Sequence, residues 1–200
     1  MPHSWEVEQK FEVDDVSRLL NTLHAAGFIE DGLERHSDIY FRHPSRDFRK
    51  SDEALRIRSS NDSACVTYKG VRTDAEVKTR PETELSIAPA EMHQWEQLLQ
   101  LLGFQPLPAV RKIRKLFSYV GSNAGKVGST ATDLWEGMVV CFDDVEQLGT
   151  FVELEILVES VEALDQAQDR IRRAAAALGL WQVQSKSYLS QLLAKLGIEK

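Results

Sequence analysis

The sequence has few of the features that mark secreted or membrane-spanning proteins. It contains only two cysteines, Cys65 and Cys141, and neither belongs to a CxxC pair. A disulfide framework or a cysteine-based metal clip is therefore not indicated. No apolar run approaches the ~20 residues that span a bilayer, and no basic segment followed by an apolar one marks a signal peptide near Met1. We expect a soluble, cytoplasmic protein with no membrane partner.

Basic residues are also fewer than acidic residues. Lys and Arg number 24 against 31 Asp and Glu, which gives a net charge of -7 over 200 residues. An acidic chain neutralises a nucleic-acid backbone poorly, so we expect no nucleic-acid partner. A small anion in a locally basic cavity remains compatible with this balance. Apolar residues make up 42% of the chain, which is enough to build a folded core.

The hydrophobic periodicity predicts four amphipathic helices and about eight strands. The helices are expected over residues 13–26, 89–102, 161–178 and 187–196. The strands are expected over residues 5–13, 35–41, 54–60, 64–70, 78–87, 110–120, 137–144 and 150–158. Strands come in runs rather than alternating with helices, which favours an antiparallel sheet in an α+β fold. Trp95 and Trp181 are predicted to be core aromatics.

The predicted strands carry charge at every second position, which is the spacing of one strand face. Glu6 and Glu8 share a face, as do Arg56 and Arg58, Lys112 and Arg114, and Glu153 and Glu155. One interpretation is a half-buried sheet with a solvated charged face. The other is a sheet curled into a barrel, with these charges facing its lumen. Like charges repeated within single strands favour the barrel, because like neighbours repel on an open surface.

A barrel of this kind would enclose as many acids as bases. The inward acids would be Glu6, Glu8, Glu82, Glu84, Asp143, Glu153 and Glu155, and the bases Lys10, Arg56, Arg58, Lys69, Arg80, Lys112 and Arg114. Charges so crowded need partners, since burying them unpaired is costly. A polyphosphate on the bases and a divalent cation on the carboxylates would supply those partners.

Short motifs distributed along the chain resemble one family. The run EVEQK at residues 6–10 resembles the ExExK signature of the CYTH superfamily, the triphosphate tunnel metalloenzymes. Further matches follow in order: DIYF at 38–41, ALRIR at 54–58, TYKG at 67–70, RPETE at 80–84, KIR at 112–114, FDDVEQLGTFVELE at 142–155 and SYLSQLL at 187–193. The resemblance covers nearly the whole chain, and residues 1–200 are interpreted as a single CYTH domain.

The resemblance implies a closed eight-stranded antiparallel β-barrel with flanking helices and a triphosphate inside, together with Mg²⁺ or Mn²⁺. The implied metal ligands are Glu6, Glu8, Asp143, Glu153 and Glu155. The implied triphosphate-binding residues are Lys10, Arg56, Arg58, Lys69, Lys112 and Arg114. Within these sets, the resemblance points to Glu6, Glu8, Lys10 and Asp143 as the catalytic residues. Arg80, Glu82 and Glu84 match the family in pattern, and their roles stay open.

The family includes class IV adenylyl cyclases and thiamine triphosphatases, and the run at residues 40–56 resembles the cyclase branch most. Our hypothesis is a cyclase-like enzyme that converts ATP to cyclic AMP and pyrophosphate, and this branch also suggests a homodimer. One alternative is a triphosphatase acting on inorganic triphosphate, thiamine triphosphate or a nucleoside triphosphate. Another is a polyphosphate-binding module without activity. In each case the partner is a small molecule that contains a triphosphate.

Overall fold

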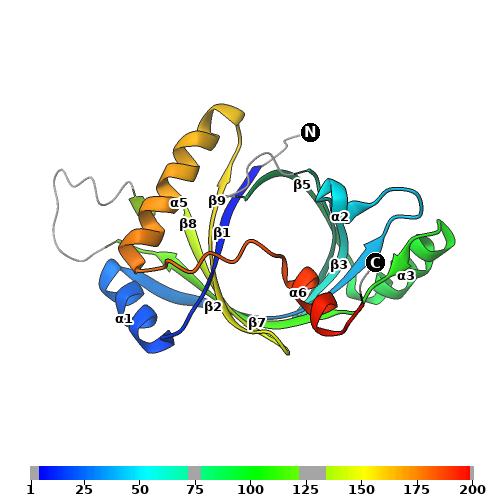
Figure 1. Cartoon of the computed structure of the whole chain (residues 1–200), viewed down its shortest axis with the longest axis horizontal. Helices are drawn as coiled ribbons and strands as arrows, with labels where there is room; N and C mark the ends of the chain where they lie inside the picture. Colours follow the sequence, from blue (N-terminus) through cyan, green and yellow to red (C-terminus); the bar gives the residue numbers. More distant parts are fainter. Residues whose placement is uncertain (1–4, 72–77, 122–133, 199–200) are drawn as a thin grey trace.

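Eight antiparallel strands close into a barrel in the computed structural model (Figure 1), which describes residues 5–71, 78–121 and 134–198. The strands are β1 (Trp5–Glu12), β2 (Phe28–Arg42), β3 (Ala54–Ser60), β4 (Ser63–Lys69), β5 (Lys78–Ile87), β7 (Val110–Tyr119), β8 (Met138–Val145) and β9 (Gly149–Val158). They follow the order β3-β4-β5-β1-β9-β8-β7-β2, and a pairing between β2 and β3 closes the ring. The predicted barrel is confirmed, and the open solvated sheet is wrong.

Strand β2 is much longer than predicted and joins the two sides of the ring. Its pairing with β7 begins at Phe28, and the segment from His36 to Tyr40 also pairs with β3. The register shifts between Glu30 and Gly32, as at a β-bulge. The first half of β2 is largely polar and exposed, so it lacks the apolar alternation that marks a strand. A short strand that was not predicted, β6 (Gln105–Pro106), pairs with the end of β2.

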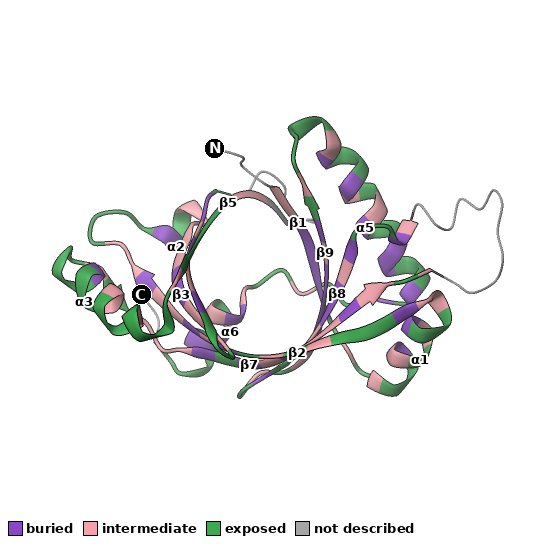
Figure 2. Cartoon of the chain, turned by 180° about the vertical axis from the view of Figure 1, so that it is seen from behind, coloured by how far each residue is buried: buried purple, intermediate pink, exposed green. Residues whose placement is uncertain are grey.

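Two helices pack against one side of the barrel (Figure 2), and they form the main core there. Helix α1 (Val16–Ala26) begins at Asp15, whose side chain accepts a hydrogen bond from the Arg18 amide. Helix α5 (Leu164–Leu178) follows the short 3-10 helix η2 (Val161–Ala163). Leu23 of α1 and Ile171 of α5 are fully buried in one apolar cluster, which also contains Val7 of β1 and Val152 of β9. The apolar stripes of both predicted helices therefore face the barrel wall.

Two further helices lie at the other side. The 3-10 helix η1 (Pro89–Glu91) leads into α3 (Met92–Leu101), whose Leu99 packs with Phe41 and Ile57. The short α2 (Phe48–Ser51) lies between the strands predicted at 35–41 and 54–60, where no helix was predicted. Asp47 caps its first turn by accepting hydrogen bonds from the amides of residues 49 and 50.

The C-terminal segment runs along β1 and then crosses one end of the barrel as α6 (Tyr188–Lys195) (Figure 1). The Glu12 amide donates to the Gln182 carbonyl, and the Gln184 amide donates to the Lys10 carbonyl. Trp181 lies in this segment and is 73% exposed, so its prediction as a core aromatic is wrong. Trp181 lies in the connection between α5 (Leu164–Leu178) and α6, outside the apolar clusters that the helices form with the barrel. None of the described helices has the length and apolar character needed to cross a membrane.

Candidate functional site

The barrel encloses one cavity of about 1300 Å³, and all eight barrel strands contribute to its lining. Alternation along each strand turns every second side chain inward. Thirteen of the fourteen charged residues predicted to face the lumen line this cavity: Glu6, Glu8, Lys10, Arg56, Arg58, Lys69, Arg80, Glu82, Glu84, Lys112, Arg114, Glu153 and Glu155. Asp143 is the exception, and it lies fully buried behind the lining.

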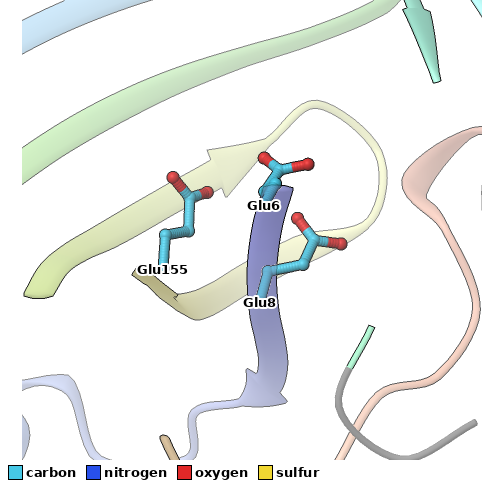
Figure 3. Close-up of side chains that lie close together, drawn as sticks. All are labelled: Glu6, Glu8 and Glu155. Carbon is cyan, nitrogen blue, oxygen red and sulfur yellow. The ribbon is translucent and has the colours of Figure 1, made fainter. Parts of the chain in front are cut away.

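Three of the predicted metal ligands form a compact acidic cluster. Glu8 and Glu155 are directly paired across β1 and β9, and Glu6 lies one inward position along β1. One carboxylate oxygen of each residue lies within 4.8 Å of the others (Figure 3). Divalent cations such as Mg²⁺ and Mn²⁺ favour carboxylate oxygens in such groupings. We call Glu6, Glu8 and Glu155 the acidic triplet.

Two bases contact the acidic triplet: Lys69 Nζ contacts Glu6, and Arg114 Nη1 donates to Glu155 at 3.1 Å. Burial raises the pKa of Glu6 to about 8; Lys69 opposes this shift, whereas Glu8, Glu82 and Glu155 add to it. Burial also raises the pKa of Glu155. Carboxyl groups with such raised pKa values are held close together at a cost, which a bound cation would remove. The donor set therefore fits a divalent metal ion.

The two other predicted metal ligands lie with the bases instead. Asp143 accepts hydrogen bonds from Lys112 Nζ at 2.8 Å and from Arg114 Nε and Nη2 at 2.7 Å each. Burial opposes the charge of Asp143, but Lys112 and Arg114 outweigh it and lower its pKa. Glu153 accepts from Arg114 Nη2, and Arg114 and Lys112 lower its pKa to about 2 despite its burial. Neither carboxylate belongs to the acidic triplet.

Asp38 likewise accepts hydrogen bonds from two bases, Arg56 and Arg58. No role was predicted for it from the sequence. It is buried on β2 and accepts bonds of 2.7 Å from both Nε and Nη2 of Arg58. Arg56 Nη1 lies 3.4 Å from the same carboxylate. The motif at 38–41 places Asp38 and Tyr40 on the inward face, and that spacing was the signal available in the sequence.

Two arginines in the cavity wall each have an unsatisfied hydrogen-bond donor. The Nε atoms of Arg56 and Arg80 are buried and have no hydrogen-bond partner. Buried donors of this kind are normally satisfied, and phosphate oxygens are acceptors that suit a guanidinium. Nearby, Lys69 Nζ contacts Glu6 and lies 2.8 Å from Glu82. Glu84 accepts a 3.0 Å hydrogen bond from Thr67 Oγ1, away from the acidic triplet.

Lys10 is 2% exposed, and its Nζ donates to the Lys186 carbonyl at 2.7 Å. Tyr188 of α6 reaches the same end of the barrel, where its hydroxyl donates to Asp143 at 2.9 Å. In the sequence, Tyr188 is recognisable only as part of the motif at 187–193, because local spacing does not show which strand a C-terminal helix meets.

The fold and the site together define a class of protein. Its members are closed antiparallel barrels whose cavity is lined by clustered carboxylates and by bases. The family model described as the CYTH domain matches residues 4–188. The chain belongs to the CYTH family.

Comparison with known proteins identifies relatives over nearly the full length. A protein of Methanocaldococcus jannaschii named "Putative adenylate cyclase" is 34% identical over 186 residues, which are 92% of this chain and 96% of the relative. A solved structure from Pyrococcus horikoshii is 34% identical, with a TM-score of 0.79 over 95% of this chain and 99% of that one. A Hippeastrum structure shares the fold at 16% identity, with a TM-score of 0.64 over 97% and 96% of the two chains. That protein is described as a "putative adenylyl cyclase" with a dominant triphosphatase activity.

Proposed function

We propose that this protein is a divalent-metal-dependent enzyme that converts ATP to cyclic AMP and pyrophosphate inside the barrel. The observation that carries the proposal is the presence of the acidic triplet and seven inward bases around one cavity. Membership of the CYTH family supports an enzyme acting on triphosphates, and the name of the M. jannaschii relative supports the cyclase reaction.

The bases supply the triphosphate-binding wall. Arg56 and Arg80 each have a buried Nε without a partner, and a phosphate oxygen would accept from each. Lys10, Arg58, Lys69, Lys112 and Arg114 add positive charge around the same space. Phosphoryl transfer depends mainly on positioning and charge stabilisation, so a fixed set of bases is the main contribution that this wall makes.

Glu6, Glu8 and Glu155 would hold Mg²⁺ or Mn²⁺, since their oxygens already lie within 4.8 Å of one another. When bound, the ion would neutralise charge that develops on the phosphate oxygens. Asp143 and Glu153 have a different role in this proposal. Each accepts hydrogen bonds from Arg114 and lies outside the acidic triplet, so in this proposal they orient the bases rather than coordinate the ion.

The size and lining of the cavity favour a substrate with an organic group. Pockets that enclose a drug-sized ligand measure about 300–1,000 Å³, and this cavity of about 1300 Å³ exceeds that range. Leu107, Leu189 and Leu193 give part of its lining an apolar character. In the cyclase reaction a bond forms between the ribose 3′ oxygen and the α-phosphorus while the bond from that phosphorus to pyrophosphate breaks.

Hydrolysis of a triphosphate is the second candidate function. The same acidic triplet and bases would serve a water molecule that attacks the terminal phosphorus, with orthophosphate as one product. The Hippeastrum protein, which shares the fold alone, is described as chiefly a triphosphatase. The name adenylyl cyclase therefore does not decide the reaction for this fold.

Product analysis distinguishes the candidates. The purified protein is incubated with ATP, thiamine triphosphate or inorganic triphosphate, each with Mg²⁺ or Mn²⁺, and the products are separated by chromatography. We expect cyclic AMP and pyrophosphate from ATP, whereas ADP and phosphate would replace the cyclase assignment with hydrolysis. Glu6→Gln is expected to lower turnover at least ~100-fold, since it removes a charged ligand. The exposed Glu146 provides the control, and Glu146→Gln should keep wild-type turnover.

A further inference from the structure

An aromatic side chain from the C-terminal helix enters the ionic interior of the barrel. Tyr188 is the first residue of α6 and is 7% exposed. Its ring lies 5.1 Å from that of Phe151, measured between centroids. Ser187 caps the helix by accepting a hydrogen bond from the Ser190 amide. The first turn of α6 is therefore anchored where the helix crosses the end of the barrel (Figure 1).

Two of the proposed phosphate-binding lysines lie against this ring. Lys10 Nζ is 3.9 Å and Lys112 Nζ is 5.2 Å from the ring centroid of Tyr188. Both distances fall within the ~6 Å over which a ring attracts a cation. Lys112 Nζ and the Tyr188 hydroxyl also share the same Oδ2 atom of Asp143. One side chain thus contacts both ammonium groups and the carboxylate that holds one of them.

The ammonium groups of Lys10 and Lys112 could also move closer to carboxylates in the cavity. Lysine has a long, flexible side chain that carries its charge at a point. The charge of Lys10 acts on Glu153, and that of Lys112 acts on both Asp143 and Glu153. An ammonium group drawn fully onto these carboxylates would be less available to a phosphate. The ring offers each lysine a site that attracts the cation without neutralising it.

We infer that Tyr188 is a positioning residue whose ring fixes Lys10 and Lys112 where they meet the triphosphate. The inference rests on the proposed function, in which both lysines bind phosphate oxygens. It adds that the affinity of the barrel for triphosphate depends on a side chain of α6 that need not touch the phosphates.

Binding of inorganic triphosphate, measured by calorimetry in EDTA, tests the inference without metal-dependent turnover. Tyr188→Leu should weaken the affinity about tenfold, within the range of a buried cation–π contact. Tyr188→Phe keeps the ring and should recover most of this loss. Leu192→Ala serves as the matched control, because Leu192 packs in the same cluster from the same helix. It should lower the melting temperature while leaving the affinity within about twofold of wild type.

A double-mutant cycle with Lys10→Met separates positioning from general loosening of the helix. In the Lys10→Met background, Tyr188→Leu should cost clearly less than its tenfold effect in the wild type, because its main partner is gone. Each of four results would overturn the inference but not the proposed function. Two concern the ring itself: wild-type affinity in Tyr188→Leu, or no recovery in Tyr188→Phe. The others are an equal loss in Leu192→Ala and strict additivity in the cycle. Failure of the wild type itself to bind triphosphate would overturn the proposed function as well.

Discussion

Carboxylates of similar burial behave in opposite ways inside this barrel, according to their nearest neighbours. Glu6 lies beside other acids, and its pKa rises to about 8, chiefly through burial. Glu153 is equally removed from water, but Arg114 and Lys112 bring its pKa down to about 2. The surroundings of each carboxylate therefore set the direction of its pKa shift: around Glu6, burial and three neighbouring acids outweigh Lys69, whereas around Glu153 the bases outweigh burial. At the residue scale, Glu6 and Glu153 therefore differ in electrostatic environment although both are inward carboxylates of neighbouring strands.

His36 supplies a pH-dependent prediction at the same scale. It is 5% exposed, and burial together with the charges of Arg58, Lys112 and Arg114 lowers its pKa to about 3. The neutral ring hydrogen-bonds Glu34 through Nε2 at 2.6 Å. Because the unfolded state binds a proton near pH 6.5 and the folded state does not, acidification from pH 6.5 towards 3 should lower the free energy of unfolding. The slope from this group is at most ~1.4 kcal/mol per pH unit.

Urea denaturation at several pH values measures this effect. The free energy of unfolding of His36→Gln should fall less steeply between pH 6.5 and 4 than that of the wild type. His24→Gln provides the control, because His24 is exposed on α1. Parallel curves for wild type and His36→Gln would show that the ring does not remain neutral in the folded protein.

At the scale of elements, the helices differ in what they contribute to the site. Helices α1 and α5 bury apolar side chains against the outside of the barrel wall. Helix α6 instead sends Tyr188 to the charged interior, where it meets Asp143. The outer helices therefore stabilise the wall that carries the site, whereas α6 contributes a side chain to the site itself.

Helix α3 allows a paired test of its packing. Leu99 is 8% exposed and packs with Phe41 and Ile57, whereas Leu101, two residues away on the same helix, is 86% exposed. Leu99→Ala should lower the free energy of unfolding by about 2–4 kcal/mol through the cavity it leaves. Leu101→Ala should change it by less than about 0.5 kcal/mol. Chemical denaturation of both variants checks this, and equal losses would contradict the packing of α3 on the barrel.

The whole molecule combines a net charge of -7 with a cavity whose lining includes all seven bases predicted to face the lumen. Closure of the barrel makes this separation possible, since side chains from strands far apart in the chain converge on one lumen. Asp38, Asp143 and Glu153 hold the bases in position. A polyanion entering the cavity would meet a preformed surface rather than one that must assemble, which lowers the entropic cost of binding.

Thermal unfolding tests this property of the whole molecule. Triphosphate with Mg²⁺ at about 100 times its Kd should stabilise the protein by ~2.7 kcal/mol, which raises the Tm by roughly 5–10 °C for a chain of this size. Glu6→Gln should lose the part of the shift that depends on metal. An equal shift with a DNA oligonucleotide of the same charge would show non-specific anion binding instead.

Sequence alone determined which residues face the lumen and which family the chain resembles. A period of two assigns each strand residue to a face, so the inward positions of Glu6, Arg56 and Lys112 follow from local spacing. The first half of β2 was missed because its residues are polar, and its pairing with β7 compensates for that.

Only the tertiary structure decided which charges are neighbours. The period of a strand says nothing about what lies across the barrel. The sequence therefore could not show that Glu6, Glu8 and Glu155 cluster, nor that Asp143 and Glu153 lie outside this cluster against Arg114. Lys10 meets the Lys186 carbonyl, and Tyr188 meets Asp143, across long stretches of sequence. Coulombic and hydrogen-bond energies depend on distances in space, and barrel closure and the docking of α6 set those distances.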